Sequence, residues 1–266
     1  MVTLRERVQA GERLFGSFVF LPSASTVEIL GRAGLDFVII DREHSPAGWE
    51  TVENMVRAAD LCGMSALIRV AHNSDNEILH ALEVGAAGIV IPFVETADAV
   101  RRAAGSLRYA PEGTRGTCTQ TRAAGYSAHR AGFVDLARRL NSELLLAGLI
   151  ENRTGMENIT EIMAVDPGLD VVIIGRSDLA SDLGRPGQTG DPLVVAATER
   201  IISAVQRAPG GMRQSGVAIY SAAEAEQWAA QGCRFFAYPS EAGMLYEAAS
   251  ALKRDVAARW GSSITN

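Results

Sequence analysis

A repeated order of helix, glycine and short apolar strand constrains this chain more than any other feature. Three segments show it clearly: GRAGLDFVII, EVGAAGIVI and AAQGCRFFAY. The apolar runs are short and mostly rich in β-branched residues, which is typical of strands buried on both faces of a parallel sheet. Strands that alternate with helices of roughly 10–15 residues indicate right-handed βαβ units.

The same pattern, followed along the whole chain, predicts eight strands separated by helices. The predicted strands cover 14–20, 37–40, 66–70, 88–93, 144–150, 171–174, 216–220 and 234–238. The predicted helices cover 4–10, 25–33, 49–62, 76–84, 96–107, 133–141, 155–165, a short helix after 178, 193–207, 222–230 and 241–259. Eight such units in about 250 residues predict an α/β fold of the (β/α)8 TIM barrel type, as a single domain over residues 1–266. A doubly wound open sheet is the alternative, but no GxGxxG follows the first strand.

Composition excludes several classes of function. The net charge is −6 and no basic block is present, which argues against nucleic acid as a partner. The three cysteines lie far apart without a CxxC pair, which fits a reducing compartment. The charged start has no apolar signal segment, and no apolar run approaches the roughly 20 residues of a membrane helix. We therefore expect a cytoplasmic metabolic enzyme with a small-molecule substrate and no membrane partner.

Residues that could take part in catalysis or ligand binding lie where the predicted strands end. They are Phe18 on the first strand; Asp41, Arg42, Glu43 and His44 after the second; Arg69 in the third; Glu151 after the fifth; and Gly175, Arg176, Ser177 and Asp178 after the sixth. In a (β/α)8 barrel the carboxyl ends of all strands meet at one rim, and that rim carries the catalytic groups. The sequence therefore predicts that these residues converge.

Two acids suggest a metal site at this rim. Glu151 follows seven apolar residues, so its carboxylate is expected in a place with little water, where an unpaired charge is costly. Together with Asp178 it would suit a hard divalent ion such as Mg²⁺ or Mn²⁺, which keeps open positions for water and substrate oxygens. Two structural alternatives stay open: Asp178 as a helix cap, and Glu151 in a salt bridge to Arg153.

Other groups could handle the substrate. An inward Arg69 would polarise a carbonyl or hold a carboxylate, whereas an outward one would be a rim residue. His44 is an imidazole suited to proton transfer near neutral pH, or a surface residue; His72 is a weaker second candidate. The turn 175–178 opens a helix whose free N–H groups could bind an anion. Arg115 in PEGTRG could add an anion contact, although a solvated turn also explains it.

Five motifs in this order resemble a known family. DFVIIDREH, LIRV, RYAPEGTRG, LIEN followed by TGMENI, and IGRSDLASDLG are similar to those of the HpcH/HpaI class II aldolases, from about Gly16 to the terminal helix. The resemblance implies a phosphoenolpyruvate/pyruvate-type barrel and a homo-hexamer, a trimer of dimers, with the last helix exchanged between subunits. It implies a lyase that cleaves 4-hydroxy-2-oxo acids to pyruvate, or oxaloacetate, and an aldehyde. The implied cofactor is Mg²⁺ or Mn²⁺, with Co²⁺ as a third option.

The resemblance also assigns roles by position. It implies Glu151 and Asp178 as metal ligands, Arg69 on the pyruvyl oxygen, His44 as acid/base, Asp41 and Glu43 as its acidic neighbours, the backbone of Gly175 and Ser177 as the carboxylate-binding turn, Phe18 as an aromatic wall, and Glu83 as an acid that reaches a neighbouring subunit's site.

Three positions depart from the family pattern. Arg42 stands where the family commonly has Gly, Arg176 where it commonly has Pro, and Leu149 where some members have Gln. Two additional guanidinium groups suggest a more anionic substrate than a simple sugar acid. A related activity in siderophore biosynthesis, citrate formation from oxaloacetate and acetyl-CoA, is the enzymatic alternative. A barrel that binds a keto acid without turnover is the non-enzymatic one.

Overall fold

The computed structural model of the chain describes residues 2–210 and 212–260. Eight parallel strands form one closed barrel in chain order, with the last strand beside the first. They are β1 (Leu14–Val19), β2 (Phe37–Asp41), β3 (Ser65–Arg69), β4 (Gly88–Ile91), β5 (Leu145–Ile150), β6 (Val171–Ile174), β7 (Gln214–Ala218) and β8 (Phe235–Tyr238). The prediction of an eight-stranded α/β barrel is confirmed, and the open sheet is excluded.

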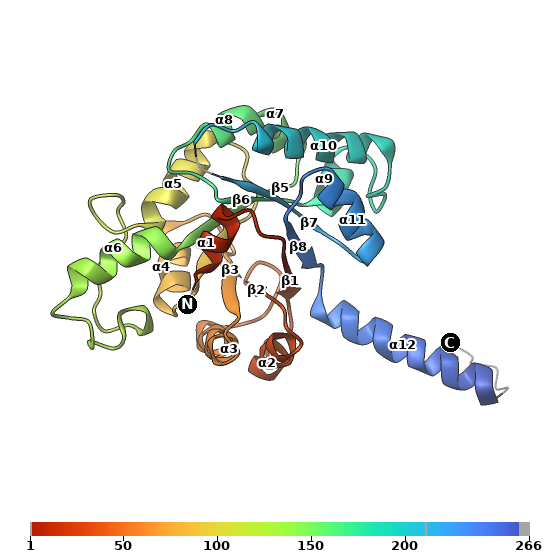
Figure 1. Cartoon of the computed structure of the whole chain (residues 1–266), viewed down its shortest axis with the longest axis horizontal. Coiled ribbons are helices and arrows are strands. Elements are labelled where there is room, and N and C mark those ends of the chain that lie inside the picture. Colours follow the sequence, from red (N-terminus) through yellow and green to blue (C-terminus); the bar gives the residue numbers. More distant parts are fainter. Residues whose placement is uncertain (1, 211, 261–266) are drawn as a thin grey trace.

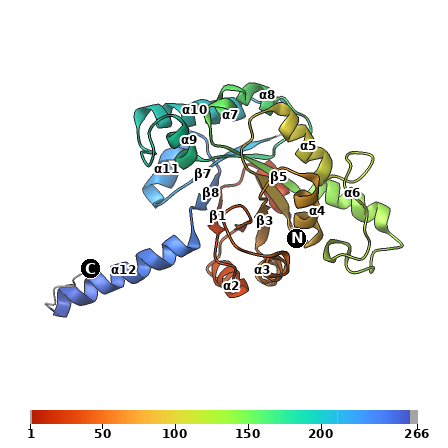
Figure 2. The same ribbon diagram turned by 180° about the vertical axis from the view of Figure 1, so that it is seen from behind.

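Helices surround the barrel in both views (Figures 1 and 2). They are α1 (Leu4–Gln9), α2 (Ala24–Arg32), α3 (Trp49–Leu61), α4 (Asp75–Glu83), α5 (Ala97–Leu107), the 3-10 turn η1 (Arg122–Ala124), α6 (Phe133–Glu143), α7 (Arg153–Glu157), α8 (Ile159–Met163), α9 (Arg176–Asp182), α10 (Pro192–Gln206), α11 (Ala222–Ala230) and α12 (Glu241–Trp260). The prediction of one helix over 155–165 is wrong, because Asn158 ends α7 and begins α8. The Asn158 amide donates instead to the carbonyl of Glu95, 2.9 Å away.

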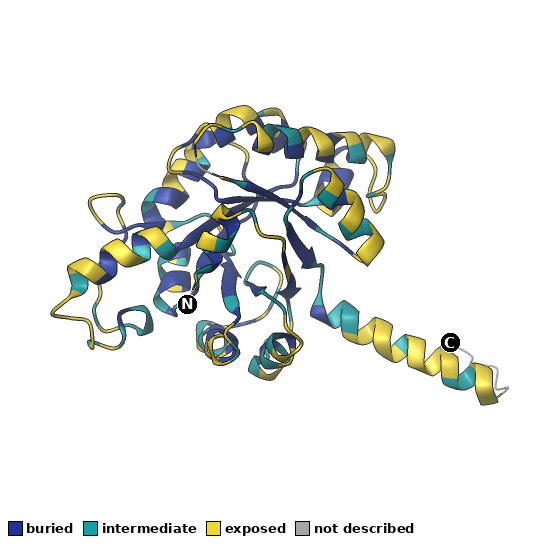
Figure 3. Cartoon of the chain, in the orientation of Figure 1, coloured by how far each residue is buried: buried dark blue, intermediate teal, exposed yellow. Residues whose placement is uncertain are grey.

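Alternating strand residues divide the core into two layers. Inside the barrel lie Leu14, Phe37, Ile39, Leu67, Val90, Leu145, Ala147, Leu149, Val171, Ile173 and Phe235, among others. The strand residues between them, such as Val38 and Ile40, pack against the helices in a second cluster. Figure 3 shows the buried strands at the centre of the more exposed helical layer. Successive strand residues point to opposite faces, so this pattern fixes which residues face the barrel axis.

The same two-residue step selects the residues at the carboxyl rim. Two positions beyond the last apolar interior residue of β1, β2, β3, β5 and β6 lie Phe20, Asp41, Arg69, Glu151 and Gly175. Asp41, Arg69 and Glu151 are all buried. The period of the strands therefore carries these three charged groups into the uppermost layer of the barrel interior.

Helix α12 departs from the compact arrangement. It extends away from the barrel in both ribbon views (Figures 1 and 2), and of its residues only Glu241 is buried. The carboxylate of Glu241 accepts hydrogen bonds from the N–H groups of Phe20 and Leu21, at 2.9 and 2.6 Å. Leu245, Tyr246 and Leu252 are at least 66% exposed. Within residues 2–210 and 212–260, no helix combines the length and apolar character that crossing a membrane requires.

Candidate active site

A cavity of about 130 Å³ opens at the carboxyl ends of the strands. Residues that line it include Phe18, Arg69, Leu149, Glu151, Gly175, Arg176, Ser177 and Asp178, all singled out from the sequence, together with Phe20, Thr189, Tyr220 and Pro239. Strands distant in sequence thus bring two acids, two guanidinium groups and a helix start to one place. This is the rim at which (β/α)8 enzymes carry out their chemistry.

A buried ion pair organises one side of the cavity. Arg69 donates from Nε and Nη2 to the two oxygens of Asp41, both at 2.8 Å, and its Nη1 lies 3.1 Å from Glu43 Oε2. Asp41 is fully buried and also accepts from the N–H groups of Glu43 and His44, at 2.9 and 3.1 Å. Three of the five guanidinium N–H donors are used in this way, so two remain for a ligand. Asp41 orients Arg69 and the turn after β2.

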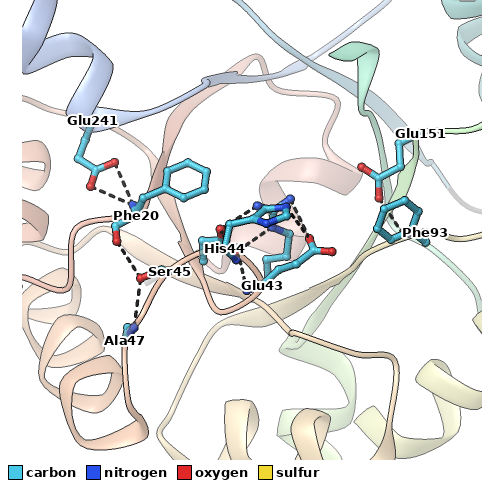
Figure 4. A network of polar contacts seen from close by, with 10 residues as sticks. Phe20, Glu43, His44, Ser45, Ala47, Phe93, Glu151 and Glu241 are labelled. Carbon is cyan, nitrogen blue, oxygen red and sulfur yellow. Dashed lines mark hydrogen bonds and ion pairs between the residues drawn. The ribbon is translucent and has the colours of Figure 1, made fainter. Parts of the chain in front are cut away.

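His44 lies on the same rim but more openly. Its side chain is 63% exposed, and its Nε2 lies 3.7 Å from Glu43 Oε2. Figure 4 shows Glu43 and His44 between Phe20 on one side and Glu151 on the other. Burial raises the pKa of Glu43, while the charges of Arg69 and His44 lower it. Glu43 thus links His44 to Arg69, because its Oε2 lies 3.7 Å from His44 Nε2 and 3.1 Å from Arg69 Nη1.

Glu151 is buried with only one hydrogen bond. Its Oε1 accepts from the N–H of Phe93 at 2.8 Å (Figure 4). Its pKa is raised to about 7, mainly because burial disfavours the charged carboxylate; the charges of Asp178 and Glu43 also raise it, while the bond from Phe93 and the charge of Arg69 lower it. Phe93 holds φ at 46°, a left-handed conformation that is strained for a bulky residue. The strained backbone of Phe93 thus carries the N–H group that donates to Glu151.

Gly175 makes room for the Glu151 carboxylate. A Cβ at position 175 would lie 2.6 Å from Glu151 Cβ and 2.8 Å from Oε2, closer than side chains can approach. The N–H of Gly175 donates to the carbonyl of Ile150 at 3.0 Å. The barrel ladder therefore uses this N–H, while the expectation that the turn of Gly175 and Ser177 binds the substrate carboxylate stays a prediction. Ser177 and Asp178, in the first turn of α9, line the cavity.

Neither structural alternative for the two acids is found among the described residues. Neither Glu151 nor Asp178 forms a salt bridge within the described ranges, and the N–H of Arg153 donates to Asp182 instead. The first turn of α9 has no side-chain cap. No group of three or more His, Cys, Asp and Glu residues suited to a metal occurs in residues 2–210 and 212–260. A site with two carboxylates would leave the other positions to water and substrate oxygens, as Mg²⁺ prefers.

The two additional arginines are held by other protein groups. Arg42 donates to the carbonyl of Ala47 and lies over the Trp49 ring, 4.1 Å from its centroid. Arg176 donates to Glu224 and to the carbonyl of Ala218, and lies 5.2 Å from the centroid of Trp228. Arg176 lines the cavity and its buried Nε has no hydrogen-bond partner among the described residues, whereas Arg42 is absent from the lining. The hypothesis of a more anionic substrate therefore stays a prediction, and of the two arginines only Arg176 is placed to serve it.

Glu83 and Arg115 pair with each other away from the cavity. Arg115 Nη2 donates to Glu83 Oε1 at 2.9 Å and its guanidinium lies 4.4 Å from the Tyr109 ring centroid. Glu83 ends α4, five residues before β4 begins, and so lies near the amino ends of the strands. Within this chain Arg115 is therefore not an anion contact of the cavity, and Glu83 lies at the opposite rim from Arg69.

Seven residues of the cavity wall escaped the sequence analysis: Phe20, Ile173, Ile174, Thr189, Ala218, Tyr220 and Pro239. Phe20, Tyr220 and Pro239 stand two positions beyond interior or inward-facing residues of β1, β7 and β8. Extending the strand period past each strand end would have found these three. Thr189 lies in the loop between α9 and α10, where no period applies.

Comparison with known proteins identifies the family. The model of the family described as HpcH/HpaI aldolase/citrate lyase matches residues 14–248. The chain belongs to this family. A relative named hydroxypyruvate/pyruvate aldolase, from Sagittula stellata, is 33% identical over 93% of this chain and 95% of its own length. A 4-hydroxy-2-oxo-heptane-1,7-dioate aldolase from Shigella sonnei is 30% identical over 99% of this chain and 96% of its own.

A solved structure of another kind of enzyme is also similar. The citrate synthase SbnG superimposes with a TM-score of 0.88 at 26% identity, over 98% of this chain and 100% of the other. Proteins similar to this chain thus carry the names of an aldolase and of a citrate synthase.

Proposed function

We propose that the protein is a class II aldolase that cleaves and forms 4-hydroxy-2-oxo acids, with pyruvate or oxaloacetate as the 2-oxo acid and an aldehyde as the second product. The observation that carries this proposal is the convergence of Arg69, Glu151 and Asp178 on one cavity at the carboxyl rim. Aldolase names among relatives of at least 30% identity over most of the chain support it.

Arg69 and the metal would act on the same developing charge. A divalent ion such as Mg²⁺ or Mn²⁺, held by Glu151 and Asp178, would supply Lewis-acid stabilisation at the 2-oxo group. The two unused N–H donors of Arg69 add a fixed positive group at the oxygen that gains charge when the enolate forms. Because Asp41 fixes the guanidinium, little reorganisation is needed during the reaction.

His44 is the proposed proton carrier. Cleavage between carbons three and four requires removal of the proton from the 4-hydroxyl group, and the reverse reaction requires its return. The exposed imidazole lies beside Glu43 on the rim where the aldehyde would leave. Asp41 holds the turn that carries His44, because its carboxylate accepts from the N–H groups of Glu43 and His44. Phe18, Ser177 and Asp178 line the space that the 2-oxo acid would occupy.

Citrate formation is the second candidate function, favoured by the structural similarity to the citrate synthase SbnG. Two assays separate the candidates. The aldolase proposal predicts metal-dependent release of pyruvate from 4-hydroxy-2-oxo acids and no citrate from oxaloacetate and acetyl-CoA. Activity in the citrate assay alone would overturn it, and no turnover in either would favour a barrel that only binds a keto acid.

The assembly is also part of the proposal. An apolar groove of about 440 Å³ lies on the outside of the barrel, lined by Phe15, Phe236, Ala225 and Ala229 among others. A helix that follows β8 would ordinarily cover this region, yet α12 points away and leaves Phe15 39% exposed. We propose that α12 of a second copy fills the groove, in a homo-hexamer built as a trimer of dimers.

A further inference from the structure

The arginine that begins α9 is buried beside the proposed metal ligands. Arg176 lines the same cavity as Glu151 and Asp178, and only 7% of its surface is exposed. Its Nη2 donates to the carbonyl of Ala218 at 2.8 Å and to the carboxylate of Glu224. A guanidinium group keeps its charge in proteins, and a buried charge without a partner is strongly destabilising. Arg176 therefore depends on a carboxylate close by.

Helix α11 holds the carboxylate of Glu224 in place. Ser221, the N-cap of this helix, accepts from the N–H of Glu224 at 3.2 Å. In a capping box the glutamate would accept in return from the N–H of the cap residue. Here one carboxylate oxygen accepts from the N–H of Tyr220 at 2.9 Å, and the other from Arg176. Trp228, one turn further along α11, lies with its ring centroid 5.2 Å from the guanidinium. These contacts hold the guanidinium against α11.

Without Glu224 the guanidinium would compete with the metal ion. The acids of the described cavity lining are Glu151 and Asp178, the two proposed ligands. A long, flexible arginine side chain that loses its partner would find these two carboxylates in the same cavity. An ion pair with either acid would occupy carboxylate oxygens that the metal ion needs and would place a second positive charge beside it.

We propose that Glu224 is a positioning residue of the metal site, which holds Arg176 against α11 and so keeps both acids free for the divalent ion. This inference rests on the proposed function, which assigns the ion to Glu151 and Asp178. Glu224 itself is absent from the described residues that line the cavity. It acts through Arg176 and contacts neither the ion nor the substrate.

Mn²⁺ binding to E224Q tests the proposal. The amide keeps the size of the side chain and an oxygen acceptor for the N–H of Tyr220, but it removes the charge that holds Arg176. In the absence of substrate, we expect the dissociation constant for Mn²⁺, measured by electron paramagnetic resonance, to rise at least about 10-fold. The measurement is made well below the midpoint of thermal unfolding, so that a loss of stability alone does not change it. An affinity equal to that of the wild type would overturn the proposal.

A matched control removes a carboxylate elsewhere. Glu199 is exposed on α10, so E199Q should bind Mn²⁺ within about 2-fold of the wild type, because solvent and salt screen a surface charge. A loss in E199Q as large as that in E224Q would assign the effect to net charge and overturn the proposal. E224A, which places a strong helix former in α11, repeats the measurement if E224Q does not fold, with the same loss expected.

Removal of the arginine tests whether Glu224 acts through it. Proline suits position 176, because it is the first residue of α9 and the proline ring fixes φ near the helical value. R176P and the double variant R176P/E224Q should both bind Mn²⁺ within about 3-fold of the wild type, since neither contains the competing guanidinium. If the double variant binds as weakly as E224Q, or if R176P alone does, Glu224 does not act by restraining Arg176 and the proposal is overturned.

A further measurement separates this inference from the proposed function. Exchange of the pyruvate methyl protons with deuterium from solvent reports enolate formation and needs no aldehyde. Exchange by the Mn²⁺-loaded wild type, together with unchanged Mn²⁺ affinity in E224Q, would overturn the role of Glu224 alone. A wild type that neither binds Mn²⁺ nor exchanges these protons would overturn the aldolase proposal and, with it, the inference built on it.

Discussion

At the scale of single residues, Glu151 shows how the site trades stability for chemistry. The carboxyl is 3% exposed and has one hydrogen bond, so its ionised form is poorly compensated in the protein alone. Burial favours the neutral carboxyl, while the bond from Phe93 N–H only partly offsets this for the carboxylate. The position therefore fits an acid that becomes favourable only when a cation is present.

Replacement of Glu151 by Gln should separate stability from activity. The wild-type carboxyl has a folded pKa of about 7 and an unfolded value of about 4.3. Between these values the folded state binds more protons, so the free energy of unfolding of the wild type falls as pH rises from about 4.3 to 7 and levels off above. E151Q has no carboxyl at this position, so its free energy of unfolding does not fall in this way. At pH 8 it should be more stable than the wild type by on the order of 3 kcal/mol.

Urea unfolding in the presence of a chelator measures this difference at pH 8 and at pH 4. We expect the advantage of E151Q at pH 8 to disappear at pH 4, while its aldolase activity falls by about 10³-fold or more because a metal ligand is lost. An E151Q protein that is less stable than the wild type at pH 8 would contradict the claim that the buried, charged carboxylate of Glu151 destabilises the fold.

Residue types at strand ends could be predicted from the sequence, but their partners could not. The two-residue period of β2 and β3 places Asp41 and Arg69 inside the barrel, and register pairs them directly. Arg42 and Arg176 have long, flexible side chains beside several acceptors. Which of these each guanidinium reaches depends on Trp49 and on Glu224, which lie in other elements.

At the scale of elements, the junction of β6 and α9 fixes how close the start of α9 lies to the end of β5, which carries Glu151. The carbonyl of Ile150 accepts from Gly175, so the end of β5 and the start of α9 are tied by one hydrogen bond. The missing Cβ of Gly175 leaves the space that Glu151 uses. The φ of Gly175 is −79°, which any residue can adopt, so space and not backbone freedom explains the glycine.

The variant G175A should therefore act through Glu151. A methyl group at this position would force the base of the Glu151 side chain to move, and overpacking of this kind costs about 1–3 kcal/mol. We expect kcat/KM to fall by about 100-fold or more. The matched control is G190A, because a Cβ at Gly190 has nothing within 4 Å. Thermal unfolding and aldolase assays compare the two, and wild-type activity in G175A would refute this role.

Helices and strands could be predicted where a local sequence pattern determines their boundaries. Glycines such as Gly34, Gly85 and Gly232 hold positive φ after a helix, and the strand that follows is apolar, so strand boundaries fall within two residues of those expected. The break between α7 and α8 was not predictable from period, because the apolar pattern continues through it. A contact from Asn158 to Glu95, 63 residues away, is involved there.

At the scale of the whole molecule, α12 and the apolar groove are two exposed surfaces that complement each other. Leu245 and Leu252 are each 66% exposed, and the groove beside α11 exposes Phe15. Sequence period indicates that α12 is a helix but not what covers it. Burying one such leucine fully contributes roughly 1.5–3 kcal/mol.

Charges placed on this helix should dissociate the assembly. In the double variant L245D/L252D, each exchanged helix should bind its groove at least about 100-fold more weakly. Light scattering coupled to size-exclusion chromatography should then report smaller species than the hexamer that we propose for the wild type. K253D adds a charge on the same helix without removing an apolar side chain and should stay assembled. A wild-type monomer, or an unchanged mass in the double variant, would rule out the exchange.

The central claim is that Glu151 and Asp178 share one divalent ion that holds an enolate-like ligand beside Arg69. Mn²⁺ binding, followed by electron paramagnetic resonance with and without oxalate, tests it most directly. We predict one Mn²⁺ per chain in the wild type, tighter binding when oxalate is present, and about 30-fold or greater weakening in both E151Q and D178N. Mn²⁺ binding that is as tight in both variants as in the wild type, or that does not respond to oxalate, would contradict it.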